Sequence, residues 1–514
     1  MPLTATSFTD TAGRRIVPTK AGKATALLVV VTLLTRWPAW HNRFGESDSA
    51  RYAVGILQWL RDPRHAGAPE IYGRVFSPAY DWGAVHVLTA FPRLVSELPL
   101  LLNAASLVAA LLSAPLLLAI GRRFVSGEAA FWATLFFLVT PAYWWLGIEP
   151  LPQGWSSLGY LLAIWLALRA QEATDTRQAW FCRGGSAIAL ACGLACKSDL
   201  VLGLAVFPLL ELRRPAAASC PKWAQLATGS VVPAMASFLF LLLRSLLLGE
   251  GWRESQQAAG HAVGTFLAWP HGPTLVKQLL PMWLGAGVLT PIFLLGMGRA
   301  WRVLSTERRG LWCWLLAAWS APSVVFWFLI RGNNARHTAL VILPWLWLAV
   351  AGWFLRQRRQ APFLVLVLLA GNFLIVPPSS NIALYPSGNV PASSAVLAAR
   401  QREMKSAATL LCHPPPASCY LGWYTNPYLE YDLMQECGTD GVLDDRGNWT
   451  LFHSTVKQSG RVQPRVVAFR EVNDVQEYLA AARSCSAASS LEYEKAGKQW
   501  YFGREISAAS ASRR

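Results

Sequence analysis

Long apolar stretches recur along most of this chain, and short polar segments separate them. Stretches near the roughly 20 residues that cross a bilayer lie at 24–40, 99–120, 128–146, 154–170, 227–248, 278–298, 311–330, 338–355 and 361–376. A longer run, 184–212, is interrupted by Lys197, Ser198 and Asp199, and this break predicts two short helices that meet there. The pattern predicts an all-α polytopic membrane protein with about eleven transmembrane helices.

Positive charge is concentrated in alternate loops. If the segment 1–23 is cytoplasmic, all the loops rich in Lys and Arg lie on the cytoplasmic side. The loops on the opposite side are poorer in Lys and Arg for their length. The basic residues of the cytoplasmic loops are Arg122, Arg123, Arg169, Arg177, Arg183, Arg213, Arg214, Lys222, Arg299, Arg302, Arg308, Arg309, Arg356, Arg358 and Arg359. The bias predicts a cytoplasmic N-terminus, and an odd number of spans places the C-terminus outside.

Two polar regions are expected outside the membrane. The first is the loop 41–98, with short amphipathic pieces at 51–60 and 79–95. The second is the tail 377–514, which is long enough for a small domain. Its pattern predicts helices at 400–411, 426–436 and 473–484, strands at 418–423 and 465–470, and a strand pair over 491–503. We therefore expect a membrane domain over 24–376 and a small extracytoplasmic α/β domain over 377–514.

Composition supports the membrane assignment. Of the 514 residues only 15% are charged and 54% are hydrophobic, whereas a soluble domain has about 25% charged residues. The net charge of +17 resides mainly in short loops, so no nucleic-acid partner is expected. Four cysteines fall in the tail, where one or two disulfides are expected. They are Cys412, Cys419, Cys437 and Cys485.

Carboxylates lie directly beyond the first predicted span. Glu46 and Asp48 are expected at the membrane–water boundary, where a carboxylate can act as general base on a hydroxyl held within hydrogen-bond distance. The same residues also fit a structural role, because Ser47 or Asp48 can cap a helix over 49–60. The spacing leaves both interpretations open.

Cationic residues gather on the side of the membrane predicted to be outside. They are Arg36, Lys197, Arg244, Arg331, Arg336 and His337. Such a group suits a phosphate leaving group, whose developing charge needs fixed positive partners. Alternatively, Arg36 and Arg244 extend to lipid headgroups, and Lys197 pairs with nearby Asp199. Glu149, in a short outer loop, is a further candidate ligand for a sugar hydroxyl.

Three stretches, taken in order, resemble the GT-C class of membrane glycosyltransferases, in the branch of protein O-mannosyltransferases and lipid A aminoarabinose transferases. Residues 48–53, Asp-Ser-Ala-Arg-Tyr-Ala, resemble the acidic motif of that branch's first loop. Residues 193–200, Gly-Leu-Ala-Cys-Lys-Ser-Asp-Leu, resemble a helix end that carries a lysine. Residues 334–344, from Asn334 to Pro344, resemble a late helix that carries an Arg-Tyr or Arg-His pair. The resemblance covers about 30–376.

The resemblance implies a role for each matching residue. Asp48 would be the catalytic base and Tyr52 would line the site. Lys197 and Arg336 would contact the phosphate of a polyprenyl-phosphate sugar, assisted by His337. The family's second acid is replaced by Ser49, and Glu46 is the additional carboxylate near the donor. This departure argues against a bound metal, and no nucleotide-binding motif is present, so no cofactor besides a lipid-linked sugar donor is expected.

The expected function is inverting transfer of a sugar from a polyprenyl-phosphate donor on the outer face of the plasma (cytoplasmic) membrane. The acceptor is a glycan, a lipid or a protein, and membrane lipids surround the chain. Two alternatives from other classes stay open: a lipid or sugar transporter, and an inactive membrane scaffold. A transporter is expected to place polar groups near the midplane and to show paired repeats, neither of which the sequence displays.

Overall fold

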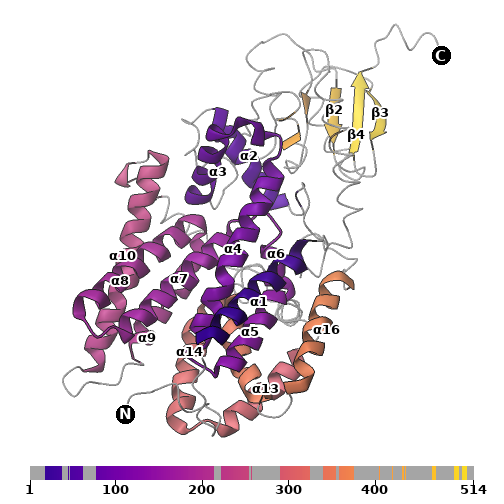
Figure 1. The fold of residues 1–514 in the computed structure, drawn as a ribbon. Coiled ribbons are helices and arrows are strands. Elements are labelled where there is room, and N and C mark those ends of the chain that lie inside the picture. The colour runs from indigo at the N-terminus through magenta and orange to yellow at the C-terminus, as the bar shows by residue number, and fades with distance from the viewer. Residues whose placement is uncertain are drawn as a thin grey trace. The chain divides into compact units, whose positions relative to one another are not determined.

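A computed structural model describes most of the helical part of the chain and short pieces of the tail. The described residues are 18–37, 44, 47–61, 77–212, 221–249, 251–253, 256–257, 290–324, 340–354, 358–374, 405, 419–420, 431–432, 435, 466–469, 491–496 and 500–505. They are mostly helical (Figure 1). Their contacts divide the chain into two compact units.

The first unit is built from helices. It comprises Met1–Asn42, Ser77–Tyr80 and Leu100–Ser394. Its helices are α1 (Pro18–Arg36), α4 (Leu98–Gly121), α5 (Gly127–Val139), α6 (Pro141–Leu146), α7 (Gln153–Glu172), α8 (Thr176–Cys196), α9 (Val206–Glu211), α10 (Lys222–Leu248), α13 (Thr290–Val303), α14 (Thr306–Val324), α15 (Leu343–Phe354) and α16 (Ala361–Leu374). In this unit α8 packs between α7 and α10, and α15 packs against both α5 and α13.

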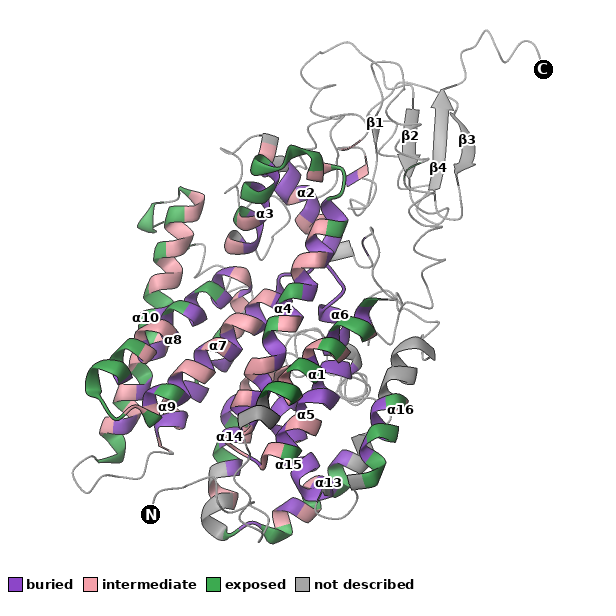
Figure 2. Cartoon of the chain, viewed as in Figure 1, coloured by how far each residue is buried: buried purple, intermediate pink, exposed green. Residues whose placement is uncertain are grey.

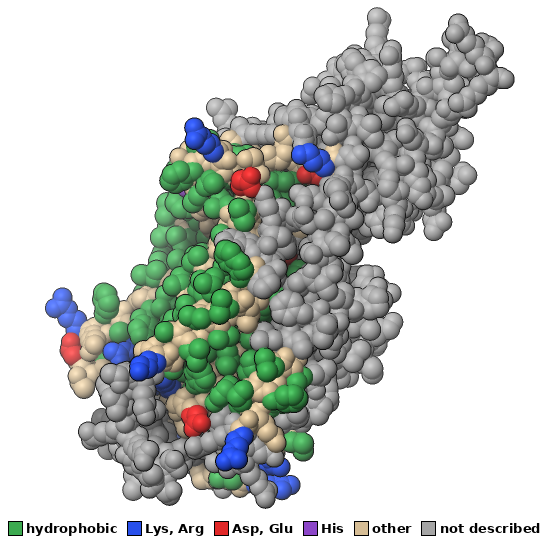
Figure 3. Space-filling model, turned by 45° about the vertical axis from the view of Figure 1, so that its right-hand side comes forward, with side chains coloured by type: hydrophobic (Ala, Val, Ile, Leu, Met, Phe, Trp, Pro, Cys, Tyr) green, Lys and Arg blue, Asp and Glu red, His purple; other side chains and the backbone are tan. Residues whose placement is uncertain are grey.

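Apolar helices with exposed apolar surfaces identify the chain as a membrane protein. Among the described residues, three helices are long and apolar enough to cross a bilayer, namely α4, α8 and α10. Only 11% of the most apolar 18-residue stretch of α10 is buried, and Figure 2 shows mainly intermediate and exposed residues along this helix. Figure 3 shows a broad band of apolar side chains on one face, with Lys and Arg at its lower margin. Water would penalise such a surface, whereas lipid tails accommodate it.

Small residues allow α7 and α8 to pack closely. A Cβ atom on Gly159 would lie 2.8 Å from the carbonyl oxygen of Ala189 and 2.9 Å from the Cα of Gly193. The two backbones therefore approach at a point where no larger residue fits. Because α7 and α8 are antiparallel neighbours in the chain, this contact brings the end of α8 beside the beginning of α7.

The predicted span 128–146 is not one continuous helix. It divides into α5 and α6 at Thr140, whose backbone is extended, with φ −60° and ψ 139°. The cause is Pro141, because a proline ring disfavours the helical conformation in the residue before it. The Thr140 hydroxyl donates a hydrogen bond of 2.6 Å to the carbonyl of Phe137, which is one of the acceptors left at the end of α5.

The predicted break at Lys197 is confirmed, but the helix before it is longer than expected. In the structure α8 begins at Thr176, whereas the predicted run began at residue 184. The Asp175 side chain caps this start by accepting from the backbone N–H groups of Arg177 and Gln178, at 3.2 and 3.3 Å. After the break, a 3-10 helix, η4 (Ser198–Gly203), leads into α9.

Arg183 was expected in a cytoplasmic loop, and this expectation is wrong. Arg183 lies within α8, and its side chain is 5% exposed. Its Nε and Nη2 atoms donate to Glu211 Oε1 of α9, at 3.1 and 2.8 Å. The buried carboxylate compensates the guanidinium charge, so the helix continues through a residue that sequence alone places in solvent.

Arg36 was expected either in a group of cations facing a phosphate or extended to lipid headgroups, and both expectations are wrong. The residue is 1% exposed at the end of α1. Its Nη2 atom donates to the carbonyl oxygens of Leu138 and Tyr143, at 2.9 and 3.3 Å. These acceptors belong to the end of α5 and to α6, so the guanidinium satisfies backbone groups where the chain changes direction.

The second unit contains parts of the first loop and the tail. It comprises Arg43–Phe76, Asp81–Pro99 and Ala395–Arg514. It includes α2 (Ser47–Arg61), most of α3 (Pro78–Ala90), a 3-10 helix η3 (Pro92–Val95), and the strands β1 (Cys419–Tyr420), β2 (Val466–Phe469), β3 (Leu491–Ala496) and β4 (Trp500–Glu505). Inside this unit the rings of Phe44 and Tyr431 meet edge to face, with centroids 4.8 Å apart.

The four strands form one sheet in the order β1-β2-β4-β3. β1 pairs with β2 in parallel, and β4 is antiparallel to both β2 and β3. Each strand overlaps one of the three segments in which the sequence predicts strands. The predicted tail helices and the pairing of Cys412, Cys437 and Cys485 fall largely or wholly outside the described residues, so the α/β class of the tail stays a prediction. The domain boundaries and the count of eleven spans also stay predictions.

Candidate functional site

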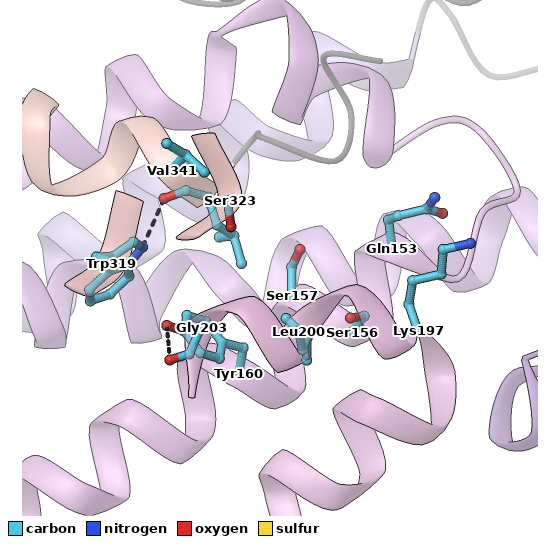
Figure 4. Close-up of a pocket in the computed structure, with 11 residues that line it drawn as sticks. Gln153, Ser156, Ser157, Tyr160, Lys197, Leu200, Gly203, Trp319, Ser323 and Val341 are labelled. Carbon is cyan, nitrogen blue, oxygen red and sulfur yellow. Dashed lines mark hydrogen bonds between the residues drawn. The ribbon is translucent and has the colours of Figure 1, made fainter. Parts of the chain in front are cut away.

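A pocket opens between helices of the first unit. Its volume is about 50 Å³, which is room for roughly four water molecules. Eleven residues line it: Gln153, Ser156, Ser157, Tyr160, Lys197, Leu200, Gly203, Trp319, Ser323, Leu340 and Val341. Figure 4 shows these side chains around the cavity. They come from α7, the end of α8, η4, α14 and the turn before α15.

One face of α7 supplies most of the polar groups. Gln153, Ser156, Ser157 and Tyr160 follow one another at intervals of three, one and three residues, which places them on one side of a helix. All four are buried, with exposed fractions of 5%, 4%, 6% and 2%. A polar stripe inside an otherwise apolar helix is costly unless it faces polar partners or a ligand.

Lys197 reaches the pocket because α8 ends directly before it. Its backbone is extended, with φ −155° and ψ 118°, and its N–H still donates to the carbonyl of Gly193 at 2.9 Å. Ser77 donates from its hydroxyl to the carbonyl of Cys196, the last residue of α8. The backbone on the helix side of Lys197 is therefore held at two points. The side chain itself is buried, with the residue only 7% exposed.

The other end of the pocket is aromatic. The rings of Tyr160 and Trp319 lie edge to face, with centroids 5.7 Å apart and an interplanar angle of 82°. The Tyr160 hydroxyl donates to the carbonyl of Gly203 at 3.0 Å, and the Trp319 indole N–H donates to the carbonyl of Leu340 at 2.9 Å. Both bonds are drawn in Figure 4. They hold η4 and the turn before α15 against α7 and α14.

The Gln153 amide is unusual among the pocket groups. Among the residues that the structure describes, neither its nitrogen nor its oxygen has a hydrogen-bond partner. Figure 4 shows this amide at the same end of the pocket as the Lys197 ammonium group. A buried amide with both atoms unpaired is rare in folded proteins. The pocket therefore presents a cation and an unused donor–acceptor pair to whatever occupies it.

The other predicted site residues are described only in part. Asp48 is the second residue of α2, which begins at Ser47, so it lies in the first helical turn and does not precede the helix as a cap. Tyr52 follows it by one turn on the same helix. Glu46, Arg336 and His337 lie outside the described residues. Glu149 is fully buried, and its carbonyl accepts a 2.7 Å hydrogen bond from Ser106.

Within the described ranges, no three His, Cys, Asp or Glu side chains come together as metal ligands. The sequence interpretation did select Lys197 but missed the α7 face. The signal was available, because polar residues at helical spacing interrupt the apolar run 154–170. Their function was not readable from the chain, since the opposite wall comes from α14 and the turn before α15, well over a hundred residues further along.

Comparison with solved structures identifies the fold. The structure is similar to apo ArnT from Cupriavidus metallidurans, with a TM-score of 0.59 and 14% identity over 95% of this chain and 98% of that one. The same protein bound to undecaprenyl phosphate gives a TM-score of 0.56 and 13% identity over 95% and 99%. An oligosaccharyltransferase from Archaeoglobus fulgidus, in complex with zinc and sulfate, gives 0.50 and 14% over 93% and 72%.

No protein-family model matches the sequence, and no curated protein matches it either. ArnT is a lipid A aminoarabinose transferase, and both structural neighbours are GT-C glycosyltransferases. The low identity means that the likeness is one of fold. The chain therefore has the fold of the GT-C membrane glycosyltransferases, which confirms the resemblance that its sequence motifs indicated.

Proposed function

We propose that this protein is a membrane glycosyltransferase that moves a sugar from a polyprenyl-phosphate donor to an acceptor. The observation that carries the proposal is Lys197, a buried cation that lines a pocket beside several polar side chains at the broken end of a membrane helix. Ionisable residues at such positions are costly and usually functional. A phosphate suits this position, because an ammonium group forms strong charge-assisted hydrogen bonds with phosphate oxygens.

The fold supports the choice of donor. One structural neighbour, ArnT from Cupriavidus metallidurans, has been solved with undecaprenyl phosphate bound. In the proposal, Lys197 and Arg336 bind the donor phosphate, and His337 assists them. Tyr52 and Glu46 contact the donor or line its site. The positive groups stabilise the phosphate as it leaves, which is where negative charge develops in the transition state.

Asp48 is the proposed general base. It removes a proton from the acceptor's hydroxyl or amine, and the resulting nucleophile attacks the anomeric carbon on the side opposite the phosphate. The bond from that carbon to the phosphate oxygen breaks, polyprenyl phosphate departs with the electron pair, and the configuration inverts. The acceptor is a glycan, a lipid or a protein. The proposal includes no resident metal or other cofactor.

The proposed location is the plasma membrane, with the N-terminus in the cytoplasm and the tail outside. The support is the Lys and Arg bias of the loops. The reaction would then take place on the outer face of the membrane. Modification of cysteines introduced at the two termini with a membrane-impermeant reagent tests this orientation.

Transfer of radiolabelled sugar from polyprenyl-phosphate donors tests the proposed function. We compare the native protein in liposomes with Lys197→Met and with Lys222→Met, which removes an exposed lysine at the start of α10. The proposal predicts transfer by the native protein and the Lys222→Met control, and its loss in Lys197→Met. Equal transfer by both variants would remove Lys197 from the donor site. Accumulation of the intact lipid-linked donor on the opposite side of the liposome, without transfer, would favour a transporter.

A further inference from the structure

The polar residues of α7 offer hydrogen-bonding groups that a phosphate alone cannot pair with. An ionised phosphodiester offers acceptors only, so it can accept from the Lys197 ammonium and from amide N–H groups but cannot donate to an amide oxygen. The Gln153 oxygen is buried and has no partner among the described residues. A hydrogen-bond donor that arrives with a ligand would satisfy it.

The hydroxyl groups near Gln153 also favour a ligand that can donate hydrogen bonds. Ser156 and Ser157 lie one turn further along α7, and both line the same pocket. In Figure 4 the Ser157 side chain points into the cavity, away from the ribbon of its own helix. A hydroxyl both donates and accepts. Amide and hydroxyl groups side by side are complementary to a ligand that carries hydroxyls of its own.

The position of Lys197 relates these groups to the phosphate. Gln153 and Lys197 occupy the same end of the pocket (Figure 4), whereas Tyr160 and Trp319 form the other end. A ligand whose phosphate contacts Lys197 therefore places its nearest substituents beside Gln153. In a polyprenyl-phosphate sugar, the nearest hydroxyl belongs to the carbon next to the anomeric carbon.

We propose that Gln153 is a specificity-determining residue that binds the hydroxyl next to the anomeric carbon of the donor's sugar. The amide oxygen accepts from this hydroxyl, and the amide nitrogen donates to an oxygen of the same sugar. This inference rests on the proposed function and deepens it, because it names the donor class as a sugar with a free 2-hydroxyl. A 2-deoxy sugar leaves the amide unpaired, and such sites reject ligands that lack the expected hydroxyl.

Equilibrium binding to the purified full-length protein tests this inference without depending on the acceptor. The probes are undecaprenyl phosphate alone and undecaprenyl phosphates that carry glucose, galactose, mannose or arabinose, together with the 2-deoxy counterparts, of which glucose and mannose share one. The variants are Gln153→Met, which keeps the length of the side chain and removes the amide, and Gln178→Met. The latter is a matched control, since Gln178 is an exposed glutamine in the first turn of α8.

The native protein is expected to bind at least one hydroxylated donor about tenfold or more tightly than its 2-deoxy counterpart. Gln153→Met should abolish that preference, and its affinity for unsubstituted undecaprenyl phosphate should stay within about twofold of native. Gln178→Met should behave as native in all arms. Thermal denaturation without ligand separates a binding role from a structural one: replacing an unpaired buried amide with Met should leave the melting temperature equal or raise it.

Three results would overturn the inference and leave the proposed function standing: no preference for the 2-hydroxyl in the native protein, an unchanged preference in Gln153→Met, or an equal loss of affinity for sugar-bearing and unsubstituted lipids. A lowered melting temperature in Gln153→Met without any change in preference would likewise assign the amide a structural role. If the native protein binds neither undecaprenyl phosphate nor any of its sugar derivatives, the proposed function fails together with the inference.

Discussion

The Tyr160 hydroxyl on α7 donates a 3.0 Å hydrogen bond to the carbonyl oxygen of Gly203, the last residue of η4. This bond ties the segment that follows Lys197 to the helix that carries the polar pocket residues. The two residues are also in steric contact, since a Cβ atom on residue 203 would lie 2.6 Å from the Tyr160 oxygen. The pair therefore fixes the separation between α7 and η4.

Enlarging Gly203 should disturb the pocket more than removing the hydroxyl. Tyr160→Phe loses one buried hydrogen bond and leaves a carbonyl unpaired, which costs about 1–3 kcal/mol. Gly203→Ala forces the Tyr160 ring away, and we expect weaker binding of undecaprenyl phosphate as well as a lower melting temperature. Gly184→Ala is the control, because nothing lies within 4 Å of a Cβ there. Unchanged lipid binding in Gly203→Ala would show that this contact does not shape the pocket.

Replacing either Arg183 or Glu211 alone should destabilise the protein more than replacing both. Their side chains are 5% and 6% exposed, so removing one partner leaves an unpaired buried charge, at a cost of about 3–5 kcal/mol. Glu211→Met and Arg183→Met should each lower the melting temperature strongly, whereas the double variant should recover much of the loss. Arg177→Met, an exposed change in the same helix, should have little effect. Additive losses in the double variant would contradict a direct pairing.

Arg36 should be a structural residue with no direct part in donor binding. Its guanidinium satisfies the carbonyls of Leu138 and Tyr143, so Arg36→Met leaves these acceptors buried without that donor. We expect a loss of stability of at least about 1–3 kcal/mol, measured by thermal denaturation in detergent. The remaining folded protein should bind undecaprenyl phosphate with native affinity. A loss of lipid affinity at full stability would return Arg36 to the group of phosphate ligands.

The burial of the Tyr431 hydroxyl should make the second unit sensitive to alkaline pH. Burial, and then the nearby Asp432 carboxylate, raise the pKa of the Tyr431 hydroxyl above its ordinary value. Because the folded state favours the protonated phenol, its contribution to stability is complete below about pH 10, the ordinary value for tyrosine. The contribution is then lost as pH rises through the higher folded-state pKa.

Denaturation curves between about pH 9 and 11 measure this effect as the difference between the native protein and Tyr431→Phe. The variant keeps the ring contact but has no ionisable hydroxyl, so its stability should fall less steeply across this interval. The comparison removes the contribution of the other tyrosines, which both proteins share. Parallel curves would show that Tyr431 does not ionise with a raised pKa.

The sequence predicts features that depend on local chemistry. Polar residues in an apolar run mark the break at Lys197, and short stretches rich in aromatic and other apolar residues mark the strands near 418–423, 465–470 and 491–503. The sequence does not predict the partners of buried charged residues. From the sequence alone, Arg183 is placed in a loop and Arg36 at the membrane interface. In the structure, Arg183 pairs with Glu211 of α9, and Arg36 donates to backbone carbonyls of α5 and α6. These partners are brought together by tertiary packing, which no short-range pattern records.

In the candidate site, too, only the residue with a local sequence signal could be predicted. Lys197 could be selected in advance because an ionisable residue in an apolar run is unusual by itself. Gln153 could not, because its significance comes from burial and from the lack of partners among the described residues. The roles of Asp48 and Tyr52 rest on the resemblance of their motif. Their shared place on α2 agrees with that motif without testing it.

The central claim, an inverting sugar transfer with Asp48 as base, is tested most directly by transfer from polyprenyl-phosphate donors at matched expression of native protein and Asp48→Asn. Glu128→Gln is the matched control, since it also alters a carboxylate in the first turn of a helix, α5. The account predicts that Asp48→Asn abolishes transfer while still binding undecaprenyl phosphate, and that Glu128→Gln transfers as the native protein does. Native rates of transfer in Asp48→Asn would contradict it.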